Sequence, residues 1–66
     1  MIITLNGEKK EFATSMTMDE LLGLLNFKSQ MVLVELNREI VPRDKMSSTQ
    51  VVEGDTLEIL RLVGGG

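Results

Sequence analysis

Apolar positions divide the chain into short strands around one amphipathic helix. Residues 1–5 are mostly apolar and are followed by Asn6-Gly7. This dipeptide is the strongest short signal for a hairpin, because both central positions of a type I′ turn need positive φ. Residues 8–12 form the predicted returning strand, and the charges at residues 8–11 favour an edge position, where they oppose unwanted pairing.

A helix is predicted after this hairpin. Thr17 and Glu20 have the spacing of a capping box, in which each residue bonds the backbone N–H of the other. Asn26 is the expected end of the helix. One apolar stripe follows the i, i+3, i+4, i+7 pattern and is interpreted as core: Met18, Leu21, Leu22 and Leu25.

The second half of the chain indicates further strands separated by turns. Asn37-Arg38 is the first turn, and Pro42 stops the strand after it because proline has no N–H to give to a ladder. The predicted segments are an interior strand at 31–36, a short strand at 39–41, a turn with a helical piece at 44–50, a brief strand at 51–52, a turn at 53–55 and a last strand at 56–63.

This order of elements predicts an α+β fold. One helix must cover one face of a sheet, because both need an apolar partner. The connection after the second strand is long enough for a crossover. We therefore expect a β-grasp, or ubiquitin-like, fold: a mixed sheet of four to five strands with one main helix on one face. Residues 1–63 would form one domain, and residues 64–66 a flexible C-terminal glycine tail.

The amino-acid composition excludes several kinds of catalytic and metal-binding chemistry. The 66 residues include no histidine and no cysteine, so the chain has neither an imidazole base nor a thiolate, and no ordinary zinc site. The carboxylates occur singly at turns, caps and strand faces. We therefore expect no enzyme, no catalytic residue, and no bound cofactor or metal. With only 2 phenylalanines as aromatics, aliphatic packing must supply nearly all of the stability.

The net charge of −3 argues against nucleic acid and anionic membranes as partners. It suits a protein partner with a basic face. No apolar run approaches the roughly 18 residues of a membrane span, and no signal peptide opens the sequence. We expect a cytoplasmic protein that is a monomer when free.

Gly64, Gly65 and Gly66 end the sequence directly after the last predicted strand. These residues have no side chains, so the distinctive group is the terminal carboxylate on Gly66, which we interpret as the working part. The alternatives are a frayed terminus or a remnant of expression. Glycine leaves the carbonyl open to attack and lets the tail thread a narrow channel.

Alternation along the last strand predicts a docking surface beside this tail. Leu57, Ile59 and Arg61 share one face, whereas Glu58, Leu60 and Leu62 share the other. If the face with Glu58 is open, Leu33, Leu60 and Leu62 form an apolar patch of the kind that docks partners. The alternative is that neighbouring segments cover these positions.

Three segments resemble the ThiS family, the ubiquitin-like sulfur carrier proteins of thiamine biosynthesis. They are residues 37–43, residues 53–59 and residues 63–66, the last ending in the diglycine Gly65-Gly66 with Gly64 as a spacer. The hairpin, helix position and length match as well. Met46 stands where relatives often carry an aromatic, and we expect that position to serve packing.

The resemblance implies a specific chemistry. An E1-like adenylyltransferase would use ATP and Mg²⁺ to adenylate Gly66, while Gly64 and Gly65 thread its channel. Sulfur from a cysteine desulfurase relay would then give a thiocarboxylate, which thiazole synthase consumes. The alternatives are another sulfur carrier such as the molybdopterin-synthase small subunit, a ubiquitin-like modifier of lysines, and a non-catalytic β-grasp docking module.

Overall fold

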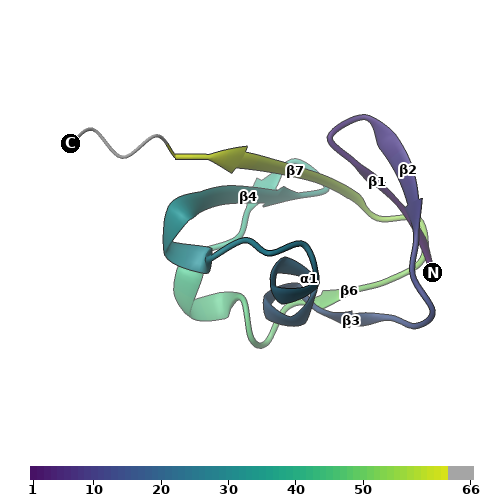
Figure 1. Cartoon of the computed structure of the whole chain (residues 1–66), viewed down its shortest axis with the longest axis horizontal. Helices are drawn as coiled ribbons and strands as arrows, with labels where there is room; N and C mark the ends of the chain where they lie inside the picture. Colours follow the sequence, from purple (N-terminus) through teal and green to yellow (C-terminus); the bar gives the residue numbers. More distant parts are fainter. Residues whose placement is uncertain (63–66) are drawn as a thin grey trace.

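The computed structural model describes residues 1–62 and combines a five-stranded sheet, a two-stranded pair and one α-helix (Figure 1). The sheet order is β2-β1-β7-β4-β5, and β3 pairs with β6. The elements are β1 (Ile2–Leu5), β2 (Glu8–Glu11), β3 (Met16–Thr17), α1 (Met18–Leu24), the 3₁₀ helix η1 (Ser29–Met31), β4 (Val32–Leu36), β5 (Glu39–Ile40), the 3₁₀ helix η2 (Arg43–Lys45), β6 (Gln50–Val51) and β7 (Thr56–Arg61).

The large sheet is mixed, because β1 and β7 are parallel while the other neighbours are antiparallel. Figure 1 shows α1 on one side of strands β4 and β7, with β3 and β6 on that same side. The predicted α+β architecture, with one main helix on one face of a sheet, is therefore confirmed. The strand β2 lies at an edge, as its run of charges predicted.

Two tight turns shape the strand ends. Asn6 and Gly7 have φ values of 49° and 84°, the positive values that a type I′ hairpin turn needs. Asn37 and Arg38 also have positive φ, at 50° and 73°. Both predicted turns are confirmed. Arg38 takes the left-handed conformation at the second turn position, where the first turn has Gly7.

The capping box at the start of α1 is also confirmed. The Thr17 hydroxyl accepts the Glu20 N–H at 3.2 Å, and the Glu20 carboxylate accepts the Thr17 N–H at 2.9 Å. The Thr17 N–H and the Thr17 hydroxyl, which donates to the Glu20 carboxylate at 3.0 Å, favour the ionised form and hold the pKa of Glu20 below its ordinary value. The helix ends at Leu24, earlier than predicted, and Asn26 takes a left-handed φ of 63° just beyond it.

The core is aliphatic and lies between α1 and the sheet. Three members of the predicted stripe are fully buried, whereas Leu25 is half-buried at the end of the helix. Met46 is only 3% exposed, which confirms its packing role. The buried residues are Ile3, Leu5, Met18, Leu21, Leu22, Val32, Val34, Val41, Met46, Val51, Leu57 and Ile59.

Several boundaries differ from the sequence prediction. The strand β3 was not predicted, because two residues show no alternation; Met16 pairs with Val51 and Thr17 with Gln50. The brief strand predicted at 51–52 is therefore shifted by one residue. Met31 closes η1 instead of opening β4, and β7 ends at Arg61.

Replacing Leu22 with alanine tests the core. Leu22 is 1% exposed, so Leu22→Ala should lower the free energy of unfolding by roughly 2–5 kcal/mol through lost burial and a residual cavity. Urea unfolding measures this change. Leu24→Ala is the matched control, since Leu24 is 63% exposed on the same helix and should change stability by about 0.5 kcal/mol or less. Equal effects of the two substitutions would contradict the assigned helix face.

Candidate functional site

The strand β7 leads the chain out of the fold. It is the middle strand of the sheet, with β1 on one side and β4 on the other. After Arg61, the Leu62 N–H donates to the Met31 carbonyl at 2.8 Å, so pairing continues to the last described residue. Gly64, Gly65 and Gly66, predicted as the tail and its modified terminus, lie outside the described residues.

Two asparagines from the tight turns brace β7. Asn6 accepts the Ile59 N–H at 2.8 Å and donates to the Ile59 carbonyl at 3.2 Å. Asn37 accepts the Thr56 N–H at 2.9 Å and donates to the Asp55 carboxylate at 3.0 Å. The side chains therefore satisfy backbone groups of β7 that the ladders leave unpaired.

The sheet face opposite the helix carries exposed apolar side chains. Leu60 and Leu62 are 53% and 47% exposed, and half-buried Leu33 lies directly opposite Leu60. The predicted grouping of these leucines on the open face is confirmed, whereas their role in docking stays a prediction. Ile40, 59% exposed, pairs with Glu35 on the same face. We call Leu33, Ile40, Leu60 and Leu62 the open-face patch.

Sequence reasoning did not include Ile40 in this patch. A signal was present in the alternation of residues 39–41, since Val41 is buried at 8% exposure and its neighbour must point the other way. Three residues are too few to show which side chains face the core, and the pairing of β5 with β4 was needed to place Ile40 on the open face.

Two carboxylates lie side by side within the patch. Glu35 and Glu58 are directly opposite each other on β4 and β7. Like charges in this arrangement repel and destabilise a sheet. The open face therefore combines apolar side chains with a concentration of negative charge.

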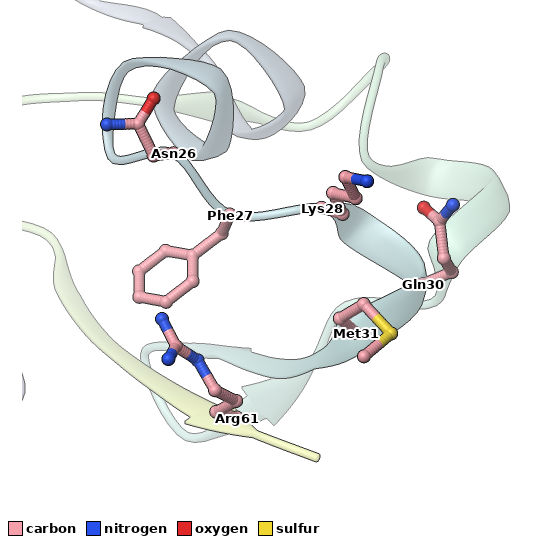
Figure 2. Close-up of a pocket in the computed structure, with 6 residues that line it drawn as sticks. All are labelled: Asn26, Phe27, Lys28, Gln30, Met31 and Arg61. Carbon is pink, nitrogen blue, oxygen red and sulfur yellow. The ribbon is translucent and has the colours of Figure 1, made fainter. Parts of the chain in front are cut away.

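A groove lies beside the same end of β7, at the C-terminal end of the helix (Figure 2). It has a volume of about 480 Å³ and is lined by Asn26, Phe27, Lys28, Gln30, Met31 and Arg61. The Arg61 guanidinium carbon lies 5.3 Å from the centre of the Phe27 ring, a cation–π contact. We call this hollow the Phe27–Arg61 groove.

Sequence reasoning placed Arg61 on the core-facing side of the last strand but missed this groove. Its register opposite buried Val32 agrees with that side. Arg61 nevertheless lies past the end of the core, where it is exposed and covers Phe27. The groove joins residues 26–31 to residue 61, and no local pattern reveals that juxtaposition.

Residues 1–62 contain neither of two other functional features, a metal-binding cluster and a membrane-spanning helix. No group of three or more potential metal-binding side chains gathers in this part of the chain. None of its helices is long and apolar enough to cross a membrane.

The fold and site define a small β-grasp domain whose middle strand carries the chain to its C-terminal residues. The ThiS family model matches residues 3–66, so the chain belongs to the ThiS family. The crystal structure of the thiamine biosynthesis protein (ThiS) from Geobacter metallireducens superposes with a TM-score of 0.87 at 38% identity, with both chains fully covered. The predicted β-grasp fold and the family resemblance are thereby confirmed.

Relatives of two lengths match the chain. The sulfur carrier protein ThiS of Bacillus subtilis is 29% identical over 66 residues, which cover 98% of this chain and 100% of that protein. The thiazole synthase of Paramagnetospirillum magneticum is 46% identical over 66 residues, which cover the whole chain but 20% of that protein. The chain therefore spans about a fifth of the thiazole synthase that it matches.

Removing one carboxylate of the open face should stabilise the fold. Glu58→Gln abolishes the repulsion with Glu35 and should raise the free energy of unfolding by about 0.2–1 kcal/mol at low ionic strength. Added salt should reduce the gain, since it screens the charges. Glu8→Gln is the control, because Glu8 lies opposite Leu5 instead of a second carboxylate. An equal gain in the control, measured by chemical unfolding, would contradict the local repulsion.

Proposed function

We propose that this chain is a sulfur carrier in the biosynthesis of the thiazole of thiamine. In this proposal the Gly66 carboxylate becomes a thiocarboxylate and gives its sulfur to a thiazole synthase. The observation that carries the proposal is the ThiS family match, which extends through residues 64–66. The placement of β7 supports it, because the middle strand of the sheet supplies a firm base for those residues.

The chemistry follows from the low reactivity of a carboxylate. With a pKa near 3.3–3.7, a terminal carboxyl is ionised at neutral pH and is a poor electrophile. An E1-like adenylyltransferase would join a carboxylate oxygen to the α-phosphorus of ATP, with Mg²⁺ on the phosphates and pyrophosphate leaving. The outer sulfur of a persulfide on the cysteine desulfurase relay would then attack the carbonyl carbon and expel AMP. A second thiol would cleave the S–S bond of the resulting acyl disulfide, forming a disulfide with the relay cysteine and leaving the thiocarboxylate on Gly66. The chain itself supplies the electrophile and no catalytic side chain.

The terminal glycines suit a buried reaction centre. Residues 63–66 would span at most roughly 14 Å when extended, which lets the carboxylate reach a nucleotide inside a partner. Gly64 and Gly65 would thread the partner's channel, since they have no side chains to block it. Thiazole synthase as the acceptor is supported by relatives of that name that contain a segment similar to this chain.

The open-face patch is the proposed docking surface for the adenylyltransferase. Its exposed leucines lie on β7, directly before the residues that must enter the partner. Burying them against the partner would release apolar surface from water, at roughly 25 cal/mol per Å². The docked body would then hold the tail in the direction of the nucleotide.

Removing the terminal glycines tests the assignment of Gly66. Deletion of residues 65–66 should abolish thiocarboxylate formation, and deletion of Gly66 alone should reduce it, because the carboxylate then lies one residue short. Both shortened proteins should unfold like wild type, since the core comprises residues that precede the tail. The measurement is intact mass after incubation with a cognate adenylyltransferase, ATP, Mg²⁺ and sulfide. A shortened protein without residues 65–66 that still exchanged oxygen for sulfur would overturn the site.

A charge at the centre of the open-face patch should weaken docking without unfolding the protein. Leu60→Glu introduces a carboxylate that must lose water on binding, so the rate of ATP–pyrophosphate exchange with the adenylyltransferase should fall. Leu60 is 53% exposed, so stability should change by about 0.5 kcal/mol or less. Leu24→Glu, on the exposed side of the helix, is the matched control. Normal exchange by folded Leu60→Glu would show that docking uses another surface.

A further inference from the structure

The Phe27–Arg61 groove differs in chemistry from the rest of this acidic chain. Its six lining residues include two cations, Lys28 and Arg61, and two amides, Asn26 and Gln30, but no carboxylate. All four polar side chains can donate hydrogen bonds. The protein as a whole has a net charge of −3. Figure 2 shows the Arg61 guanidinium against the Phe27 ring, whereas the polar ends of Asn26, Lys28 and Gln30 turn away from it. Arg61 is therefore the cationic group that faces the groove.

Hydrogen bonds fix the walls of the groove. The Phe27 N–H donates to the Leu22 carbonyl at 2.8 Å, which joins one wall to the buried helix. The Met31 N–H donates to the Lys28 carbonyl at 2.8 Å, and the Met31 carbonyl accepts the Leu62 N–H from β7. Figure 2 shows the Arg61 guanidinium against the Phe27 ring. The ring restrains the guanidinium without occupying its five N–H donors, which stay able to bond an acceptor. Because the side chain is already held in place, it loses less entropy when a ligand binds.

The form of the groove fits a carboxylate better than a phosphate. Phosphates are commonly bound by backbone N–H groups at helix N-termini. Here Asn26 and Phe27 follow the C-terminal end of α1, where the helix dipole is negative and opposes a doubly charged anion more strongly than a singly charged one. A guanidinium can bind the two oxygens of a carboxylate or of a phosphate with its planar pair of donors, so the preference for the singly charged carboxylate comes from the negative end of the helix.

We propose that the groove receives an aspartate or glutamate side chain of the protein that takes up the C-terminal tail. Arg61 directly precedes Leu62, so a partner that encloses the tail must pass this groove on one side and the open-face patch on the other. The carboxylate would bond the Arg61 guanidinium, and the more distant Lys28 would add only a weaker, long-range attraction. This inference rests on the proposed sulfur-carrier function and names a determinant of partner recognition within it.

Neutral substitutions of similar length test the inference. Arg61→Met and Lys28→Met keep an apolar stem in the groove but remove the charge. The dissociation constant for the cognate adenylyltransferase should rise about tenfold for Arg61→Met at low ionic strength, and less for Lys28→Met. Arg61→Lys should recover only part of the affinity, because it restores the charge without the planar fork. Thermal unfolding of each variant establishes that the fold is retained.

Lys10→Met is the matched control. It makes the same change in net charge on β2, where Lys10 is exposed and lies opposite core residue Ile3. A long-range charge effect would lower the affinity of Lys10→Met and of Arg61→Met for the adenylyltransferase by equal amounts. The local interaction predicts that only the groove variants lose affinity, and that their binding depends less on salt than that of wild type.

Two further measurements separate the possible failures. In one outcome, wild type forms a thiocarboxylate but Arg61→Met binds the adenylyltransferase as tightly as wild type does. That outcome would overturn the groove inference and leave the proposed function standing. Wild type that never gains sulfur from the adenylyltransferase, ATP, Mg²⁺ and sulfide would overturn the function instead. Inorganic phosphate and ATP, titrated against the free protein, should not shift the NMR signals of Phe27 and Arg61. Saturable binding of either there would identify a small-anion site and contradict a protein carboxylate as occupant.

Discussion

The placement of β7 in the middle of the sheet is the constraint on which the rest of the structure depends. Its parallel pairing with β1 joins the two ends of the chain, with Thr4 beside Thr56 and Leu5 beside Leu57. Such a long-range pairing costs loop-closure entropy, which burial of Leu57 and Ile59 against the helix offsets. The sheet closes only when the last strand is inserted. The strand that leads toward the C-terminal residues is therefore held by the same contacts that stabilise the fold.

Local chemistry made much of this fold predictable. Asn6-Gly7 specifies its turn through backbone conformation alone, and Thr17 with Glu20 specifies the helix start through two short-range hydrogen bonds. The open-face leucines were predictable for a similar reason, because alternation along β7 fixes which side chains share a face. These features depend on neighbours within a few positions of one another.

The missed features depend on tertiary contacts. The pairing of β3 with β6 involves two residues from each strand, too few to show a period. The Phe27–Arg61 groove requires that the loop after the helix and the end of β7 lie together, although more than thirty positions separate them in the chain. The modification of Gly66 stays a prediction from composition and resemblance, because residues 63–66 lie outside the described residues. Packing, not local propensity, decided each feature that sequence reasoning missed.

The end of β7 has different chemistry on its two sides. The open-face patch joins apolar side chains to the Glu35–Glu58 pair, whereas the groove presents Arg61 and Lys28. If the proposed partner contacts both sides, it needs basic groups against the Glu35–Glu58 pair and acidic groups against Arg61. Such paired charges would fix the orientation of this domain on the proposed partner, which an apolar contact alone specifies poorly.

The sheet protects its edges while leaving this face open. The edge strand β2 consists of Glu8, Lys9, Lys10 and Glu11, and the edge strand β5 has two residues before the chain reaches Pro42. Both features oppose the addition of a foreign strand. Face-to-face pairing of two copies is also disfavoured, because a two-fold contact centred on the patch would bring the glutamates of each copy toward those of the other. The open face is thus poorly suited to a second copy of this chain and better suited to a different protein with basic groups.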